Sequence, residues 1–151
     1  MNILKEKIVP YEGIGGIKLL STLDDVKKYL DENNIKYTSE YQSNKGCDPE
    51  VPWILLHIEN SIILKFAKNK LWQIFLEENY SGSLPNGIQI GMPMEKALKI
   101  DPSLSFDDWN EDYQSENGYW IEDNLDNNTV LSITIFIKEV LEEEVFYRYE
   151  W

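Results

Sequence analysis

The sequence predicts an α+β protein built from two tandem helix-then-antiparallel-meander units, residues 1–80 and residues 81–151, within one globular domain. Apolar residues recur at helical spacing in two short segments and form strand-length runs, several of them alternating, in most of the others. In addition, residues 16–26 align without gaps on residues 87–97, a shift of 71 residues, which indicates a repeated unit. The alternative is that two glycine-turn-helix starts recur by chance in a single α+β domain, which leaves the fold class unchanged.

The first unit is predicted to begin with an extended entry segment at residues 17–20 and a helix directly after it. Thr22 is the expected N-cap, because Asp25 follows three residues later and the apolar residues beyond it share one helical face. The helix should end near Asn33. Strand patterns follow at residues 37–41, 53–58, 62–66 and 71–77. In the last of these, alternation predicts one face formed by Trp72, Ile74 and Leu76.

The second unit repeats the order of helix and then strands. Its helix begins with the acidic residue Glu95 and should end before Pro102, because the residue that precedes a proline is steered away from helical backbone angles. Strands are predicted at residues 119–123, 130–137 and 145–151, with a turn at residues 124–128. The alternation of residues 130–137 is the clearest strand pattern in the chain.

Composition restricts the class of protein. Hydrophobic residues make up 42% of the 151 residues and aromatic residues 13%, which favours a folded chain over an acidic disordered one. No apolar run approaches the roughly 20 residues that span a bilayer, and none near the N-terminus suits a signal peptide, so we expect a cytoplasmic protein that does not bind membranes. A pI of about 4.4 disfavours binding to nucleic acid.

The chain lacks the usual sequence patterns of metal and cofactor sites. His57, the only histidine, lies in an apolar strand and is expected to be a packed or edge residue, and Cys47, the only cysteine, is expected to be a free structural thiol. One histidine and one cysteine cannot supply the four ligands of a structural zinc site. We therefore expect no metal, no cofactor and no catalytic residues. The enzyme alternative is a hydrolase that uses two of the many carboxylates as acid and base.

Charge and aromatic residues gather in one part of the chain. Residues 1–75 hold ten Lys/Arg and ten Asp/Glu, whereas residues 76–151 hold four and seventeen. Between Phe106 and Asp126 the acidic residues are interleaved with aromatic ones, a composition that suits an interface in which charge steers a basic partner and aromatic side chains anchor it. The alternative is a solvated acidic loop beside aromatic core residues. The residues expected to contact the partner are Asp107, Asp108, Trp109, Glu111, Asp112, Tyr113, Glu116, Tyr119, Trp120, Glu122, Asp123 and Asp126.

The segments GIKLLSTLDDV (16–26) and GIQIGMPMEKA (87–97) resemble the helix-start signature of the small-protein-A-type outer-membrane lipoproteins and of the β-lactamase inhibitor proteins. Those families consist of tandem helix-then-sheet units, and the inhibitor proteins clasp an enzyme with an aromatic and acidic surface. The resemblance implies the same tandem fold over most of the chain and a protein partner. The chain departs from both families because it has no lipobox and only one cysteine, so location and target are not carried over.

The composition is also similar to that of the immunity proteins of bacterial polymorphic-toxin and contact-dependent growth inhibition systems. Those proteins are commonly acidic because many of their toxins are basic nucleases. This similarity implies that the chain is a non-enzymatic immunity protein that covers the active-site cleft of a basic toxin domain, a nuclease, with its acidic-aromatic face. The alternative is a binding or scaffold domain of the same fold that has no toxin partner.

Overall fold

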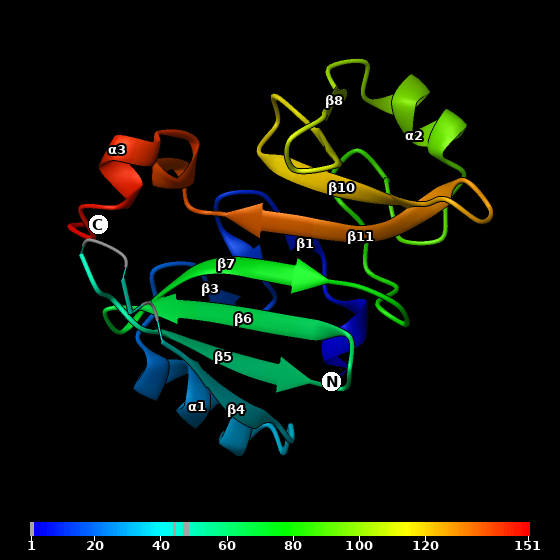
Figure 1. Cartoon of the computed structure of the whole chain (residues 1–151). Coiled ribbons are helices and arrows are strands. Elements are labelled where there is room, and N and C mark those ends of the chain that lie inside the picture. Colours follow the sequence, from blue (N-terminus) through cyan, green and yellow to red (C-terminus); the bar gives the residue numbers. More distant parts are fainter. Residues whose placement is uncertain (1, 44, 47–48) are drawn as a thin grey trace.

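The structure, a computed structural model, describes residues 2–43, 45–46 and 49–151 and confirms the α+β class with antiparallel strands (Figure 1). The helical elements are η1 (Ile3–Lys5), α1 (Leu23–Glu32), α2 (Met94–Ile100), η2 (Lys138–Leu141) and α3 (Glu143–Phe146). The strands are β1 (Ile8–Val9), β2 (Gly13–Ile14), β3 (Ile17–Lys18), β4 (Thr38–Gln42), β5 (Trp53–Ile58), β6 (Ile62–Ala67), β7 (Lys70–Leu76), β8 (Ser105–Asp107), β9 (Asp112–Gln114), β10 (Tyr119–Asn124) and β11 (Thr129–Phe136).

Eight strands form one continuous sheet in the order β4-β5-β6-β7-β11-β10-β9-β8. The two halves of the chain meet where β7 pairs with β11, from Ile133 opposite Leu76 to Phe136 opposite Gln73. In each half a helix precedes four consecutive antiparallel strands, which is the order that the predicted repeat requires. Element order alone does not establish that the halves are copies of one unit, so the repeat and the boundary at residue 80 remain predictions.

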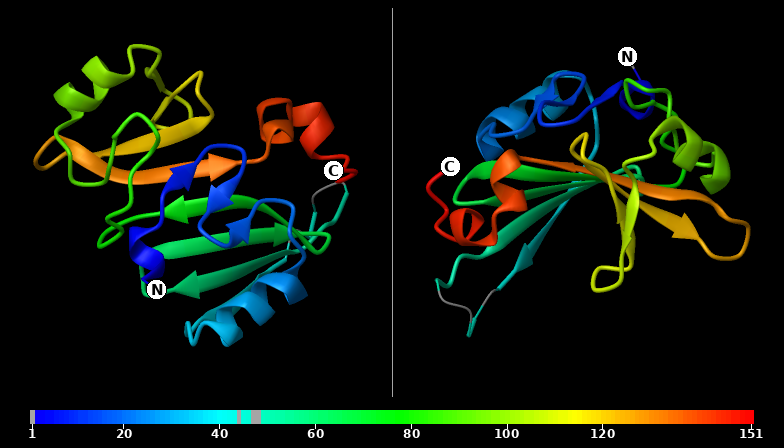
Figure 2. Two further views of the ribbon diagram at one scale, coloured as in Figure 1. Left: turned by 180° about the vertical axis from the view of Figure 1, so that it is seen from behind. Right: turned by 90° about the horizontal axis from the view of Figure 1, so that it is seen from above.

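The main core lies on one face of this sheet. Residues directly opposite each other on neighbouring strands share a face, and the row Ile62, Leu76, Ile133 and Ile121 is fully buried. The small sheet β1-β2-β3 and α1 lie together over this face, and α3 lies on the other side (Figure 2). Apolar burial on this face therefore ties the two halves of the chain into one body.

Helix α1 begins as the sequence predicts. The side chain of Thr22 accepts a hydrogen bond of 3.2 Å from the backbone N–H of Asp25, and the helix ends at Glu32. Such a cap satisfies one of the free N–H groups at a helix start.

We expect Thr22→Ala to lower the free energy of unfolding by about 1 kcal/mol, because the N–H of Asp25 loses its acceptor. Urea unfolding followed by circular dichroism measures the change. Ser43→Ala, an exposed serine outside helices and strands, is the matched control and should change the value by less than about 0.5 kcal/mol. Equal stability of the two variants would contradict the capping role.

The predicted strand at residues 145–151 is wrong. The segment forms α3 and a turn instead, because β7 and β11 are each already paired on both sides and offer no edge to another strand. Its aromatic residues pack onto the sheet face: Phe146 lies 4.8 Å from Trp72 between ring centroids, and the Tyr149 hydroxyl accepts a 3.3 Å hydrogen bond from Trp53 Nε1. The acidic residues before Phe146 favour a helix start electrostatically.

The predicted grouping of Trp72 with Ile74 and Leu76 is also wrong. The register between β6 and β7 shifts after Lys65, which pairs with Gln73, because the next residue of β6 pairs with Leu71. Strand β7 therefore has one extra residue, Trp72, at this point. Ile74 and Leu76 face the main core, whereas Trp72 turns to the opposite face, where its ring lies 5.0 Å from Trp53 and 6.0 Å from the Lys65 ammonium group. Trp72 thereby becomes part of the platform on which α3 rests.

Candidate protein-binding groove

A shallow groove of about 600 Å³ lies at the acidic end of the sheet. It forms because β9 pairs with β10 only at Trp120 and Ile121, so that β10 continues beyond the end of β9. The loop between β8 and β9 and the turn after β10 border the space that is left. The groove is lined by Phe106, Asp108, Glu111, Tyr113, Glu122, Asp123 and Leu125.

Four carboxylates give the groove its charge. Glu122 accepts a hydrogen bond of 2.9 Å from the Ser132 hydroxyl. In the described part of the chain, the side chains of Asp108, Glu111 and Asp123 form no hydrogen bond or ion pair. No Lys, Arg or His occurs between residues 99 and 138, and this interval contains nine Asp/Glu. The negative field of the groove is therefore not compensated by nearby cations of the same segment.

Apolar side chains stand among these carboxylates. Phe106 and Tyr113 pack edge to face, with ring centroids 5.2 Å apart, and form one wall of the groove. Leu125 in the turn after β10 is 83% exposed, and Trp109 at the tip of the β8–β9 loop is 91% exposed. Burying a tryptophan normally stabilises a folded protein, so a tryptophan left almost wholly in water is typical of a surface that a partner covers.

The β8–β9 loop has a defined shape. The Asp107 carboxylate accepts hydrogen bonds from the backbone N–H of Asn110, at 3.0 Å, and from its side-chain amide, at 2.6 Å. The N–H of Glu111 donates to the carbonyl of Asp107 at 2.8 Å, and Glu111 takes a left-handed backbone conformation with φ of 55°. This turn presents Trp109 at its tip. Asp107 therefore positions the loop rather than facing the groove.

Two of the residues that the sequence assigns to the surface are buried. Asp112 is 7% exposed and Tyr119 is 1% exposed, so neither side chain is available to a partner. Burial raises the pKa of Asp112, a hydrogen bond from the Gln114 side chain (3.2 Å) opposes the rise, and the neighbouring carboxylates of Asp107 and Glu122 add to it. The interface assignment of Asp112 and Tyr119 is therefore corrected, because the protein itself covers both side chains.

Asp101, which follows α2, is the buried partner of Tyr119. The Tyr119 hydroxyl donates a hydrogen bond to its carboxylate, as do the hydroxyls of Ser103 (2.6 Å) and Ser115 (2.5 Å) and the side-chain amide of Asn117 (3.1 Å). Burial alone would raise the pKa of Asp101, but these bonds outweigh it and hold the pKa well below its usual range. Burial and the same carboxylate raise the pKa of Tyr119 to about 12. This network anchors the end of α2 to the strands beside the groove.

The remaining predicted residues divide between the groove and other places. Asp126 lies in the exposed turn next to Leu125. Trp120 is half-buried against Phe136, with ring centroids 4.4 Å apart. Glu116 is exposed in the turn between β9 and β10, at the end of the hairpin remote from the groove. The structure thus brings together Asp108, Glu111, Tyr113, Glu122 and Asp123 of the predicted set, with Trp109 at the rim.

The assignment from sequence omitted two apolar residues of the groove. Phe106 belongs to the acidic-aromatic stretch but was not assigned to the interface, and its alternation with Asp107 along β8 could have placed it beside Tyr113. Leu125 was omitted although it is the one apolar residue of the polar turn NLDNN, and a leucine in such a turn has little to pack against. An apolar residue within a polar turn therefore predicts an exposed contact residue, and this pattern identifies Leu125.

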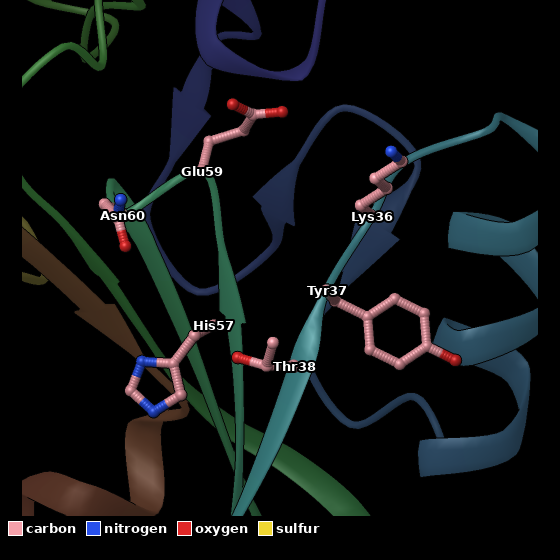
Figure 3. Close-up of a pocket in the computed structure, with 6 residues that line it drawn as sticks. All are labelled: Lys36, Tyr37, Thr38, His57, Glu59 and Asn60. Carbon is pink, nitrogen blue, oxygen red and sulfur yellow. The ribbon is translucent and has the colours of Figure 1, made fainter.

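A second hollow, of about 310 Å³, lies where β4 begins beside the end of β5. Figure 3 shows its lining side chains pointing apart rather than converging on one point. His57, one of them, pairs with Glu40 across β4 and β5, with 2.8 Å between Nε2 and Oε1. This hydrogen bond lowers the pKa of the Glu40 carboxyl below its ordinary value. Cys47 lies outside the described residues.

No family model, curated protein or solved structure matches the chain. Among the described residues, no cluster of His, Cys, Asp or Glu has a geometry that could hold a metal ion. The helices of residues 2–43, 45–46 and 49–151 are all too short or too polar to cross a membrane. The groove is therefore the feature of the molecule that best indicates its function.

Proposed function

We propose that the protein is an immunity protein that binds and neutralises a basic toxin domain, a nuclease, by covering its active-site cleft. The observation that carries the proposal is the groove between β8, β9 and β10, where carboxylates that form no ion pair with any described residue surround exposed apolar side chains. A nuclease cleft binds phosphate groups through Lys and Arg. An inhibitor that presents carboxylates in place of those phosphates occupies the same cleft and excludes the substrate.

The proposed mechanism separates attraction from retention. Asp108, Glu111, Glu122 and Asp123 would meet cations of the toxin and speed its approach, because complementary charge raises association rates. Trp109 and Leu125 would lose their contact with water and slow dissociation, because desolvated aromatic anchors act mainly on the dissociation rate. As an immunity protein of this kind, the chain would act in the cytoplasm, where an incoming nuclease reaches nucleic acid.

The proposal is tested by capture followed by an activity assay. The immobilised protein is exposed to host lysate, eluted with rising salt, and each retained protein is purified and assayed on DNA and RNA. We expect a basic protein that degrades nucleic acid and stops doing so when one equivalent of this protein is added. Capture of a protein without nuclease activity, or of a nuclease that remains active in the complex, would overturn the immunity role and favour the scaffold alternative.

The charge contribution is tested by a double substitution in the groove. Asp108→Asn with Glu111→Gln removes two carboxylates and should lower the association rate of the captured partner about tenfold at low salt, with little effect at high salt. Glu142→Gln with Glu144→Gln makes the same change of net charge on exposed residues around α3 and is the control. Stopped-flow or biosensor kinetics measure the rates. Equal slowing by both pairs would show that net charge, not the groove, steers the partner.

A further inference from the structure

The outer edge of β4 is unpaired. This strand stands first in the order of the eight-stranded sheet and pairs only with β5, in a continuous register from Thr38 opposite His57 to Gln42 opposite Trp53. Within the described part of the chain, residues 38–42 make no backbone hydrogen bond outside this pairing. One row of N–H and C=O groups along β4 therefore has no partner among the described residues, which makes the strand a template for pairing with another strand.

This edge lacks most of the features that protect edge strands, and its one charged side chain, Glu40, is paired with His57 on β5. The sequence of β4, TSEYQ, contains no proline and no lysine, and its pairing with β5 has no bulge. The Tyr41 side chain on this strand is 65% exposed. The opposite edge of the sheet differs, because β8 is only three residues long, ends with Asp107 and is followed directly by Asp108. Of the two edges of the eight-stranded sheet, β4 is therefore better suited to main-chain pairing than β8.

The distribution of charge indicates which partner fits this edge. The half of the chain that contains β4 carries ten Lys/Arg and ten Asp/Glu, whereas the excess negative charge lies in the half that contains β8. Because β4 and β8 are opposite ends of the sheet, two copies joined at β4 would keep their acidic halves as far apart as the sheet permits. Two copies joined at β8 would bring the acidic grooves together.

We infer that β4 pairs with the β4 strand of a second copy of this chain, antiparallel about a two-fold axis, so that one sheet continues through both copies. Such an interface is isologous and closes at two copies. The two-fold axis passes through Ser39 or Tyr41 in this arrangement, so that the two Glu40 carboxylates are not directly opposite each other. Like charges directly opposite each other on paired strands would destabilise the dimer. Both grooves remain open in this dimer, so the inference does not depend on the proposed function.

Sedimentation equilibrium of the full chain tests the dimer, over concentrations from micromolar to millimolar and at low and high NaCl. We expect a reversible monomer–dimer equilibrium that salt strengthens, because each copy carries a net charge of −13 and screening weakens their repulsion. Tyr41→Lys should weaken dimerisation at least tenfold, since it places charge on the paired edge. Leu141→Lys, the same change of charge on an exposed apolar residue of η2, should leave it unchanged.

Hydrogen exchange locates the interface. Outward-facing amides of residues 38–42 should exchange more slowly as the protein concentration rises, and the amides of β8 should not. A chain that stays monomeric at every concentration would overturn the inference. A dimer that Tyr41→Lys leaves intact, or one that protects other amides in place of those in β4, would overturn it as well.

Discussion

Replacing Trp109 by alanine is expected to weaken binding of the captured partner about a hundredfold, through faster dissociation, while the stability of the free protein stays unchanged. A hundredfold loss corresponds to about 2.7 kcal/mol, the range in which a buried tryptophan anchor falls. Stability should not change because the side chain is 91% exposed and contributes little to the core. A biosensor measures the dissociation rate, and thermal unfolding of the free protein checks that the variant is folded.

The matched control is Leu141→Ala, which removes an exposed apolar side chain from η2, away from the groove. It should leave the dissociation rate within about twofold of the original value, as expected for a residue outside an interface. An unchanged rate in Trp109→Ala would remove the β8–β9 loop from the binding surface. An equal rise of the dissociation rate in both variants would show that the effect of Trp109→Ala is not specific to the groove.

Replacing Asp101 by asparagine is expected to lower the free energy of unfolding by about 3 kcal/mol, the cost of breaking a buried network around a charge. The carboxylate accepts hydrogen bonds on both oxygens, from Ser103 on one side and from Ser115, Asn117 and Tyr119 on the other. An asparagine can offer one oxygen only, and its NH₂ group would face donors. Urea unfolding at neutral pH measures the loss.

The same substitution should change how stability depends on pH. The folded protein holds the pKa of Asp101 below its ordinary value of about 4, so the carboxylate stabilises the fold above that pH and the stabilisation is lost as the pH falls. Asp101→Asn should therefore lose less stability between about pH 5 and pH 2 than the original protein does. Asp126→Asn, in an exposed turn, should retain the original dependence. A parallel dependence in all three proteins would contradict the role of Asp101.

Local patterns in the sequence predict the elements that depend on local order. Helix α1 is predicted from its cap and its apolar face, and β5, β6 and β7 from strand-length apolar runs between tight turns, because each of these signals is complete within about ten residues. The segment after Glu142 has alternating aromatic residues too, but the sheet has no free edge for it there. That outcome depends on the pairing of β7 with β11, which no local pattern reveals.

The candidate site was predicted in part for the same reason. An interleaved run of acids and aromatics marks the region, and Asp108, Glu111 and Asp123 do meet in the groove. Interleaving does not tell which side chains face inward, so Tyr119 was assigned to the surface although it belongs to the core. Asp101 gave no sequence signal beyond an Asp-Pro step after a helix, because three of its four side-chain partners, Ser115, Asn117 and Tyr119, lie on another loop and another strand.

The pairing of β7 with β11 also has a consequence for synthesis of the chain. Leu76 and Ile133, which face each other, are separated by 57 residues (133 − 76). While the ribosome completes the second half, β7 is an open edge rich in apolar side chains, and the nascent first half cannot close its sheet. Closing such a distant contact costs chain entropy before the burial of apolar side chains offsets that cost. We therefore expect β7 and β11 to pair late in folding. We therefore expect the first half of the chain by itself to aggregate more readily than the complete chain.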